Sequence, residues 1–383
     1  MKMNMVIGFY AHPEYYPPTL NALACLSSEF NKIYVVHRNY PSFNWEFPSN
    51  VELVSNGRPL ATREMERMSA VKKVFFFLRF TTLLLRQIRN TAPDTVLLYD
   101  SIAVLAYRLG KPFFKKPRIL WYHNHDVIEP GSVKKYSLGG WALKAEKWIF
   151  NKLDIFSLPA LERKDHFPMS TLKGAFYFLP NYPSLKIYNQ HEKHALDGQI
   201  KILYQGSISP MHGLEEIIGM LKEKIGGREV QLVLKGFINQ EYLASLYELA
   251  DKYFVKDRLI YIGPGGYSSV IENAAQCHIG IGIHKRTDLM NSTLGTASNK
   301  IYEYAASGMP VILYDNIHFK DYLENAPWAF FTDCSDDSLS LILHKVAHNY
   351  DFYSNEARRD FEEKLNFEHY FDAIIAVLQT GRK

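Results

Sequence analysis

The stretch Ser298-Asn-Lys-Ile-Tyr-Glu-Tyr-Ala-Ala-Ser-Gly-Met-Pro310-Val-Ile-Leu-Tyr314 predicts a short helix followed by a buried strand. Asn299 is the expected N-cap, because its side-chain oxygen can accept a hydrogen bond from the first-turn amides. Gly308 suits the left-handed position after the last turn, and Pro310 prevents the helix from continuing. The segment therefore places a capped helix directly before a strand.

Helical spacing divides this segment into two faces. One face is apolar and small, which suits close packing against a sheet: Ile301, Tyr304, Ala305 and Gly308. The other face is polar: Asn299, Lys300, Glu303 and Ser307. Free amides and the positive end of the helix dipole attract phosphate, and a carboxylate one turn along can accept hydrogen bonds from both hydroxyls of a ribose. The pattern fits a nucleoside diphosphate, and equally a surface helix whose glutamate complements the dipole.

Short β-rich apolar runs alternate with helical stretches in both halves of the chain, which predicts two parallel-sheet α/β units. The expected strands of the first half are 5–9, 33–36, 51–54, 95–99, 119–122, 154–158 and 175–179. Those of the second half are 200–204, 230–234, 259–262, 279–283 and 311–314. The polar stretch 184–199 is the expected linker. The longest helical stretch is 62–90, and the last helical segment runs from about 353 to 378.

The composition is that of an ordinary globular protein, with 383 residues, 47% hydrophobic and 22% charged. Two domains are expected for this length. The net charge of +4 gives no reason to expect nucleic acid. Cys25, Cys277 and Cys334 are too widely separated for a disulfide framework or a zinc site and fit a reducing compartment. The first residues lack the apolar core of a secretory signal, and no apolar run approaches the ~20 residues of a membrane span. We expect a cytoplasmic protein.

The run Asn299-Lys-Ile-Tyr-Glu-Tyr-Ala-Ala-Ser-Gly-Met-Pro-Val-Ile312 resembles the signature of the GT-B glycosyltransferases, specifically the large retaining family 4, or group 1. The resemblance implies two Rossmann-like domains that face a cleft. Residues 1–190 would be the acceptor-side domain, residues 191–352 the nucleotide-sugar domain, and residues 353–383 a helix packing back on the first domain. It also implies that Glu303 holds the donor's ribose. The diphosphate would lie on the amides of Ser298, Asn299 and Lys300.

In open α/β sheets, ligands bind outside the carboxyl ends of the strands. The first strand is followed by His12, which we take as a substrate-binding candidate. A later strand ends in Trp121-Tyr-His-Asn-His-Asp126, where His123 and His125 share a face while the strand persists. A metal pair and a structural histidine are open alternatives. The resemblance implies that His125, with Asp126, faces the donor sugar and acts in catalysis, with His123 as the second choice.

The second domain opens with a strand, a glycine loop and a helix. Gly206 permits a tight turn and close approach to phosphate. The family usually carries an arginine after this glycine and a lysine before the next one; here Ser207 and His212 occupy these positions. Both remain candidates for binding the diphosphate. Four cations could replace the missing ones: Lys235, our first choice, then Lys300, and Lys285 or Arg286.

A second departure from the family concerns the donor sugar. The family commonly has a glutamate eight positions before the ribose-binding one, and this chain has Gly295 there. Asp288, Asn291 or backbone amides of the same loop could substitute.

The stretch 72–89 bears on partners. Lys72, Arg79 and Arg86 are seven residues apart and form a basic stripe, flanked by apolar stripes: Phe75, Phe76, Leu83 and Leu84. A basic amphipathic helix can rest on anionic lipid at the inner face of a membrane, which would suit a lipid-linked acceptor. A domain helix with a charged solvent side has the same pattern.

The sequence as a whole indicates a glycosyltransferase that uses a UDP- or GDP-linked sugar and a glycan or lipid-linked acceptor, without a metal or other cofactor. Retention of configuration and a role in surface polysaccharide synthesis follow from the resemblance alone. Two alternatives stay open. One is a UDP-sugar 2-epimerase. The other is a non-catalytic nucleotide-sugar-binding or accessory subunit, which the missing glutamate and the two missing cations favour.

Overall fold

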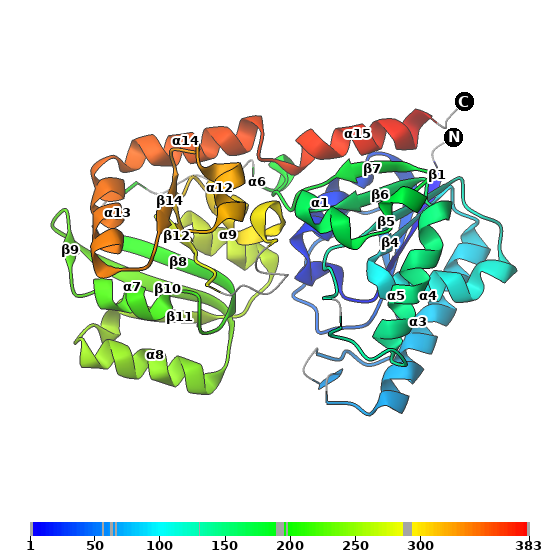
Figure 1. The fold of residues 1–383 in the computed structure, drawn as a ribbon, viewed down its shortest axis with the longest axis horizontal. Coiled ribbons are helices and arrows are strands. Elements are labelled where there is room, and N and C mark those ends of the chain that lie inside the picture. The colour runs from blue at the N-terminus through cyan, green and yellow to red at the C-terminus, as the bar shows by residue number, and fades with distance from the viewer. Residues whose placement is uncertain are drawn as a thin grey trace. The chain divides into compact units, whose positions relative to one another are not determined.

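The computed structural model describes residues 3–55, 57–61, 64–65, 67–129, 131–188, 195–196, 198–285 and 293–380. The chain forms two compact units (Figure 1). The first comprises Met1–Pro180 together with Tyr370–Lys383, and the second comprises Asn181–His369. The chain thus enters the second unit before the expected position 190, and returns to the first well after the expected position 353.

The first unit is built on a parallel sheet of seven strands in the order β3-β2-β1-β4-β5-β6-β7. Its strands are β1 (Met3–Phe9), β2 (Phe30–His37), β3 (Val51–Val54), β4 (Thr95–Tyr99), β5 (Ile119–His123), β6 (Ile155–Leu158) and β7 (Ala175–Phe178). Its helices are α1 (Pro17–Leu26), α3 (Ala70–Thr91), α4 (Asp100–Gly110) and α5 (Leu138–Ile149). α3, α4 and α5 lie side by side along the sheet (Figure 1). β4 and β5 are buried along their whole length, as strands of a parallel sheet covered on both faces are.

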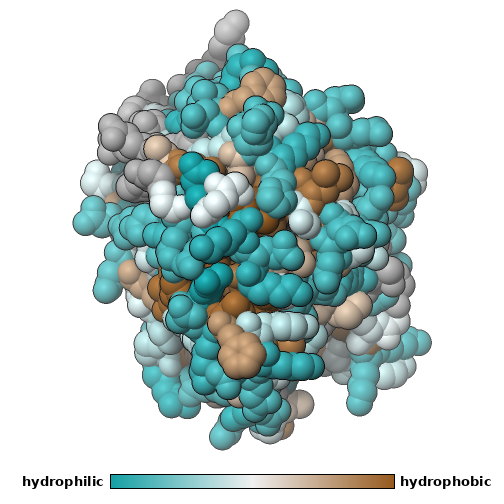
Figure 2. All heavy atoms as spheres, turned by 90° about the vertical axis from the view of Figure 1, so that its left-hand side faces the viewer, coloured by the Kyte–Doolittle hydropathy of each residue, from teal (hydrophilic) through white to brown (hydrophobic). Residues whose placement is uncertain are grey.

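The second unit repeats this architecture with the strand order β11-β10-β8-β12-β13-β14, and β9 pairs antiparallel with β10. Its strands are β8 (Ile200–Ile208), β9 (Lys224–Ile225), β10 (Arg228–Ile238), β11 (Leu259–Gly263), β12 (Ile279–Gly282), β13 (Val311–Tyr314) and β14 (Ala329–Thr332). Its helices are α6 (Leu185–Tyr188), α7 (Leu214–Met220), α8 (Gln240–Lys252), α9 (Tyr267–Ala275), α11 (Asn299–Ala306), α12 (Ile317–Leu323), α13 (Asp336–His348) and α14 (Tyr350–Glu363). The face of this unit shown in Figure 2 is mostly hydrophilic, with scattered apolar side chains.

The two units confirm the predicted pair of Rossmann-like parallel sheets. Every expected strand is present, but β9 and β14 were missed. β9 has only two residues, and β14 has four residues and pairs with β13 alone, so neither run is long enough to show a period. Helix α3 begins at Ala70 rather than near residue 62. The three cysteines are buried free thiols, in agreement with the absence of a predicted disulfide framework.

The C-terminal segment was expected as one helix and consists of two, α14 and α15 (Phe367–Thr380). Asn366 lies between the two helices and directly precedes α15. Its side-chain amide donates to the carbonyl of Phe361 at 3.0 Å, and its oxygen accepts from the His369 amide at 2.9 Å. The part of α15 that belongs to the first unit places Phe371 5.9 Å from the Trp121 ring. Among the described residues, no helix has the length and apolar character needed to cross a membrane.

Candidate functional site

The amino end of α11 differs from the prediction in its cap. Ser298, with an extended backbone (φ −81°, ψ 107°), is the N-cap, and Asn299 is already the first helical residue. The prediction of Asn299 as the cap is therefore wrong by one residue. The Ser298 side chain does not accept a hydrogen bond from the first-turn amides, which the helix itself leaves without partners. At the other end, Gly308 adopts the expected left-handed conformation with φ +68°.

The apolar face of α11 packs as predicted, and the polar face is less open than predicted. Ile301, Tyr304 and Ala305 are fully buried. Tyr304 lies so close to β12 that a Cβ added at Gly280 would be 2.2 Å from its ring. On the polar face, Glu303 is only 4% exposed. The helix therefore offers its amino end, rather than a full polar side, to a ligand.

Glu303 holds a carboxylate in the interior of the second unit. Gln205, at the carboxyl end of β8, donates from Nε2 to Glu303 Oε2 at 2.6 Å. Burial raises the pKa of Glu303 to about 7, although hydrogen bonding from Tyr267 and Gln205 and the charge of Lys300 pull it down. Near neutral pH this carboxyl is balanced between its protonated and ionised forms.

Lys300 is the second residue of this cluster whose pKa is shifted from its ordinary value. Its Nζ donates to the Tyr204 hydroxyl at 2.8 Å and lies 4.2 Å from the centroid of that ring. Burial lowers the pKa of Lys300 to about 7, and the nearby Glu303 acts in the opposite direction. An anion arriving here would stabilise the charged ammonium.

The glycine loop expected after residue 204 belongs to β8, which continues to Ile208, and Gly206 lies beside Lys300. Gly206 has φ +115°, and a Cβ added there would be 3.7 Å from Lys300 Nζ. Ser207 is exposed next to it. His212 turns inward: its ring stacks on Tyr204 at 5.0 Å, and its Nδ1 accepts from the Ser209 amide at 3.3 Å. His212 therefore contacts Tyr204 and Ser209 in this structure, while Gly206 and Ser207 are exposed residues near the end of β8.

Lys235 follows the core of β10 and is 4% exposed. Burial lowers its pKa, and the charge of Glu272 partly opposes this. Its Nζ lies at the start of α9, 2.8 Å from where a Cβ on Gly265 would be. β8 and β10 are adjacent strands, and Lys235 is paired with Gln205. Because Lys300 lies beside Gly206, the next residue of β8, Lys235 and Lys300 lie at the same end of the sheet.

The remaining candidates of the second unit either have partners within the protein or lie outside the described residues. Lys285 is engaged in an ion pair with Glu216. Gly295 is buried in a turn where its carbonyl accepts from the Tyr302 hydroxyl at 3.1 Å. Arg286, Asp288 and Asn291 lie outside the described residues.

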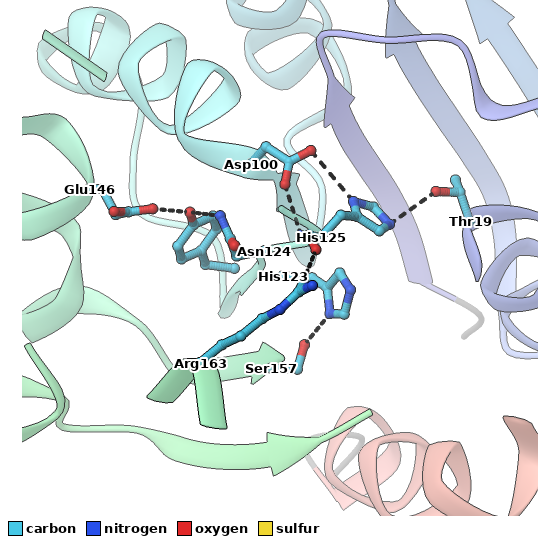
Figure 3. A network of polar contacts seen from close by, with 9 residues as sticks. Thr19, Asp100, His123, Asn124, His125, Glu146, Ser157 and Arg163 are labelled. Atoms are coloured by element: carbon cyan, nitrogen blue, oxygen red, sulfur yellow. Dashed lines mark hydrogen bonds and ion pairs between the residues drawn. The ribbon is translucent and has the colours of Figure 1, made fainter. Parts of the chain in front are cut away.

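In the first unit, His125 sits within a polar network beyond the end of β5 (Figure 3). Its backbone amide donates to Asp100 Oδ1 at 2.8 Å, and its Nδ1 is 3.4 Å from Asp100 Oδ2. Its Nε2 is 3.5 Å from the Thr19 hydroxyl, and Arg163 donates to its carbonyl. The ring stacks on Tyr99 with centroids 4.6 Å apart. The imidazole is thus fixed in orientation from both of its nitrogens.

His123, the second choice, is a structural histidine in its contacts. Its Nδ1 is 2.8 Å from the Ser157 hydroxyl, which also accepts from Trp121 Nε1 at 2.8 Å. Burial, with His125 and Arg163 nearby, holds the pKa of His123 well below its ordinary value. Within the described ranges no three or more His, Cys, Asp and Glu side chains are grouped to hold a metal ion, so the metal alternative for this histidine pair has no further ligand.

Asp126 and His12 have opposite environments. Asp126 is exposed at the start of the loop after β5. His12 is buried after β1, where its Nδ1 accepts from the Glu14 amide at 3.3 Å. Burial lowers the pKa of His12, while Glu14 raises it.

Sequence reasoning missed the partners of these residues. Asp100, with φ +62°, directly follows β4, so the rule of inspecting strand ends would have found it. Gln205 and Tyr204 belong to the end of β8, inside an expected strand or just after it. Arg163 reaches His125 from a turn with no sequence signal.

Comparisons with known proteins agree with this architecture. Residues 187–365 match the family model described as glycosyl transferases group 1. Solved structures with the same fold include sucrose-phosphate synthase from Thermosynechococcus elongatus (12% identity, TM-score 0.65, covering 100% of this chain and 98% of that one). Anabaena HepE in complex with UDP-glucose (12%, 0.65, 99% and 100%) is also similar. So is WaaG, a glycosyltransferase involved in lipopolysaccharide biosynthesis (13%, 0.61, 98% and 100%). The search of curated proteins gives no match. At these identities the structural likeness concerns the fold, which is GT-B.

Proposed function

Because residues 187–365 match the family model of the group 1 glycosyltransferases in a chain of GT-B fold, we propose that the protein transfers a sugar from a UDP- or GDP-linked donor. One observation carries the proposal: Lys300, Lys235 and the uncapped amino end of α11 meet the same edge of one sheet. A buried and a half-buried cation, with amides that no cap side chain bonds, at the carboxyl ends of parallel strands suit a diphosphate.

The reaction releases a nucleoside diphosphate, so stabilising the growing negative charge is its main electrostatic requirement. In our proposal the Lys300 and Lys235 ammonium groups and the amides of Asn299 and Lys300 do this without a metal or other cofactor. Gly206 and Ser207 give the phosphates room. Glu303, one turn along α11, accepts hydrogen bonds from the ribose hydroxyls. Its Oε2 accepts from Gln205 Nε2 at 2.6 Å, which holds the carboxylate in one orientation and supports this role.

His125 is proposed to contact the donor sugar, with Asp126 beside it. Asp100 lies at Nδ1 and the Thr19 hydroxyl at Nε2, so the imidazole is held in one orientation. A positioned ring can stabilise the transition state with no reorganisation cost. Retention of configuration, and a glycan or lipid-linked acceptor in surface polysaccharide synthesis, complete the proposal. WaaG, a glycosyltransferase involved in lipopolysaccharide biosynthesis, has the same fold, and this likeness supports the proposed role in surface polysaccharide synthesis.

Turnover tests the proposal. The protein is incubated with radiolabelled UDP- and GDP-hexoses, with and without a panel of glycan and lipid-linked acceptors. We expect release of UDP or GDP that rises with one acceptor. Binding of a nucleotide sugar without any release would instead support the non-catalytic alternative, which Gly295, Ser207 and His212 at three family positions favour.

A membrane contact through residues 72–89 is a separate part of the proposal. α3 exposes an apolar edge (Val71 79%, Phe75 55% and Leu78 50% exposed) next to Lys72. An exposed apolar strip beside basic side chains suits the surface of an anionic bilayer. Co-sedimentation with phosphatidylglycerol vesicles should fall several-fold in Phe75→Ser. The matched control is Phe254→Ser, at a residue of the second unit that is 93% exposed. Equal binding of both variants and the wild type would contradict the contact.

A further inference from the structure

The turn that leads into α11 is held by hydrogen bonds on both of its sides. This turn is a short 3-10 helix, η7 (Gly295–Ala297), and Ser298 follows it as the N-cap of α11. On one side, the amides of Ala297 and Ser298 both donate to the Leu294 carbonyl, at 2.6 Å and 2.9 Å. The Ser298 amide, which the resemblance placed at the diphosphate, therefore has a partner within the protein.

Asn181, the first residue of the second unit, holds the other side of this turn. Its backbone amide donates to the Thr296 carbonyl at 3.0 Å, and its side-chain Nδ2 donates to the Ala297 carbonyl at 2.8 Å. All three residues are buried, so water has little access to these bonds. Both donors thus come from one residue that lies 116 positions before Ala297 in the chain.

The carbonyl of Gly295 is bonded as well. The Tyr302 hydroxyl, from α11, donates to it at 3.1 Å. The Tyr302 ring packs against the ring of Tyr182, with centroids 4.3 Å apart, and both rings are buried. Asn181 and Tyr182 therefore contact both the turn and the helix that follows it. Three successive carbonyls before α11 accept hydrogen bonds from the protein.

These bonds determine the direction of the amides at the start of α11. A trans peptide group is planar, and its N–H and C=O point in opposite directions. The group that joins Ala297 to Ser298 is bonded at both ends, through its N–H to Leu294 and through its C=O to Asn181. Only the two backbone dihedral angles of Ser298 separate this fixed group from the Asn299 amide. A rotation of the fixed group would therefore turn the first amide of the helix as well.

The same bonds oppose a rotation that would bring carbonyl oxygens toward an anion at this helix end. Backbone amides attract a phosphate, whereas carbonyl oxygens carry partial negative charge and repel it. The carbonyls of residues 295–297 each accept a hydrogen bond, so turning one of them toward the ligand would break a bond in the protein interior. The turn is thus held in a conformation that suits an anion at the amides after it.

We propose that Asn181 is a positioning residue for the diphosphate. Through the carbonyls of Thr296 and Ala297 it holds the amides of Asn299 and Lys300 in the direction that phosphate oxygens require. Tyr302 acts in the same way, to a smaller extent, through the carbonyl of the turn that its hydroxyl bonds. The inference deepens the proposed function and rests on it, since it assumes a diphosphate at the amino end of α11.

The binding test compares UDP with uridine, which has the same base and ribose and no phosphate. Calorimetry gives the Kd of both ligands for the full-length wild type and each variant. Asn181→Ala should weaken UDP binding about fivefold to tenfold and leave uridine binding nearly unchanged, because only the phosphates contact the first amides of α11. Tyr302→Phe keeps the packed ring, removes one hydroxyl and should weaken UDP binding about threefold, so it gives a result even where Asn181→Ala does not fold.

The matched control for the binding test is Asn39→Ala. Asn39 Nδ2 donates to the Gly57 carbonyl at 2.7 Å, so this variant removes a bond of the same kind from the first unit. Both dissociation constants should equal those of the wild type.

Hydrogen exchange tests the positioning role without a ligand. Mass spectrometry follows deuterium uptake in peptides that cover residues 294–300, which include the two amides bonded to Leu294. Uptake there should be about tenfold faster in Asn181→Ala than in the wild type, and about threefold faster in Tyr302→Phe. Uptake in α13, a helix of the same unit, should stay at the wild-type rate, whereas a general loss of stability would raise it too.

The outcomes separate this inference from the proposed function. If Lys300→Met loses the preference for UDP over uridine while Asn181→Ala and Tyr302→Phe keep it, the positioning role is overturned and the function stands. Equal weakening of UDP and uridine, or unchanged uptake at residues 294–300, also overturns the role. If the wild type binds UDP no more tightly than uridine, the function fails, and the exchange rates alone decide whether Asn181 holds the turn.

Discussion

Each of the two sheets has a polar cluster near the carboxyl ends of its strands, around His125 in the first unit and around Lys300 and Glu303 in the second. The two clusters differ in how many of their polar groups have hydrogen-bond partners within the protein. In the first unit, Asp100, Thr19 and Arg163 contact His125, so the polar groups of this residue have partners within the protein. In the second unit, Lys300 and Glu303 both have pKa values of about 7, and the amino end of α11 has no side-chain cap.

This difference indicates a division of labour. A cluster satisfied by internal hydrogen bonds keeps one geometry, which suits orientation of a reacting group. A cluster whose pKa values are shifted close to 7 can gain or lose a proton when a ligand binds, which suits the binding of a charged ligand. Mutations in the first should therefore change turnover, and mutations in the second should change affinity.

The largest effect is expected from His125→Ala. Loss of a preorganised transition-state contact should lower kcat about 10²-fold, with less than a threefold change in the Kd for UDP. Steady-state kinetics and calorimetry measure the two quantities, and the exposed His344→Ala serves as control. A fully active variant would remove His125 from the catalytic residues and erase the contrast between the units.

Glu303→Ala comes next. Two hydrogen bonds from a ribose to a carboxylate would be lost, so the Kd for UDP or GDP should rise roughly tenfold to a hundredfold. The control Glu248→Ala removes an exposed carboxylate from α8. Calorimetry that gives the wild-type constant for Glu303→Ala would refute the ribose role.

Lys300→Met should weaken UDP binding about tenfold, because one charge-assisted contact to the diphosphate is lost. The unphosphorylated nucleoside uridine should bind with the same affinity to the variant and the wild type. Lys252→Met, at an exposed site on α8, is the matched control. Equal loss of uridine and UDP binding would show that Lys300 supports the fold and not the phosphates.

Proton linkage gives the smallest and sharpest contrast. Diphosphate favours charged Lys300 and so raises its pKa, which takes up a proton; ribose favours ionised Glu303 and so lowers its pKa, which releases one. At pH 7 the wild type should show little net proton exchange on binding UDP. Glu303→Gln should show uptake, and its affinity should fall as pH rises above 7. Lys300→Met should show release, and its affinity should fall as pH drops below 7. Calorimetry in buffers of different ionisation enthalpy measures the exchange, and the same sign in both variants would contradict the assignment.

The sequence predicted what depends on local pattern. The apolar period of Ile301, Tyr304 and Ala305 gave the correct face of α11, and Gly308 gave its end. Glu303 was placed on an open face because periodicity does not show that Gln205, on a strand almost a hundred positions earlier, covers it. The cap shifted to Ser298 because both residues are good caps, and the preceding turn, not the residue type, decides between them.

Long-range partners could not be read from the sequence. Asp100 and His125 meet because β4 and β5 are neighbours in the sheet, which follows only from the strand order.

The central claim is that a nucleoside diphosphate docks on the amino end of α11, and a crystal structure of the protein with UDP tests it most directly. We expect the diphosphate within hydrogen-bond distance of the Lys300 ammonium and the first-turn amides of α11, and the ribose hydroxyls on the Glu303 carboxylate. UDP bound elsewhere, with Lys300 still on Tyr204 and Glu303 still bonded to Gln205 and not to a ribose, would contradict the account.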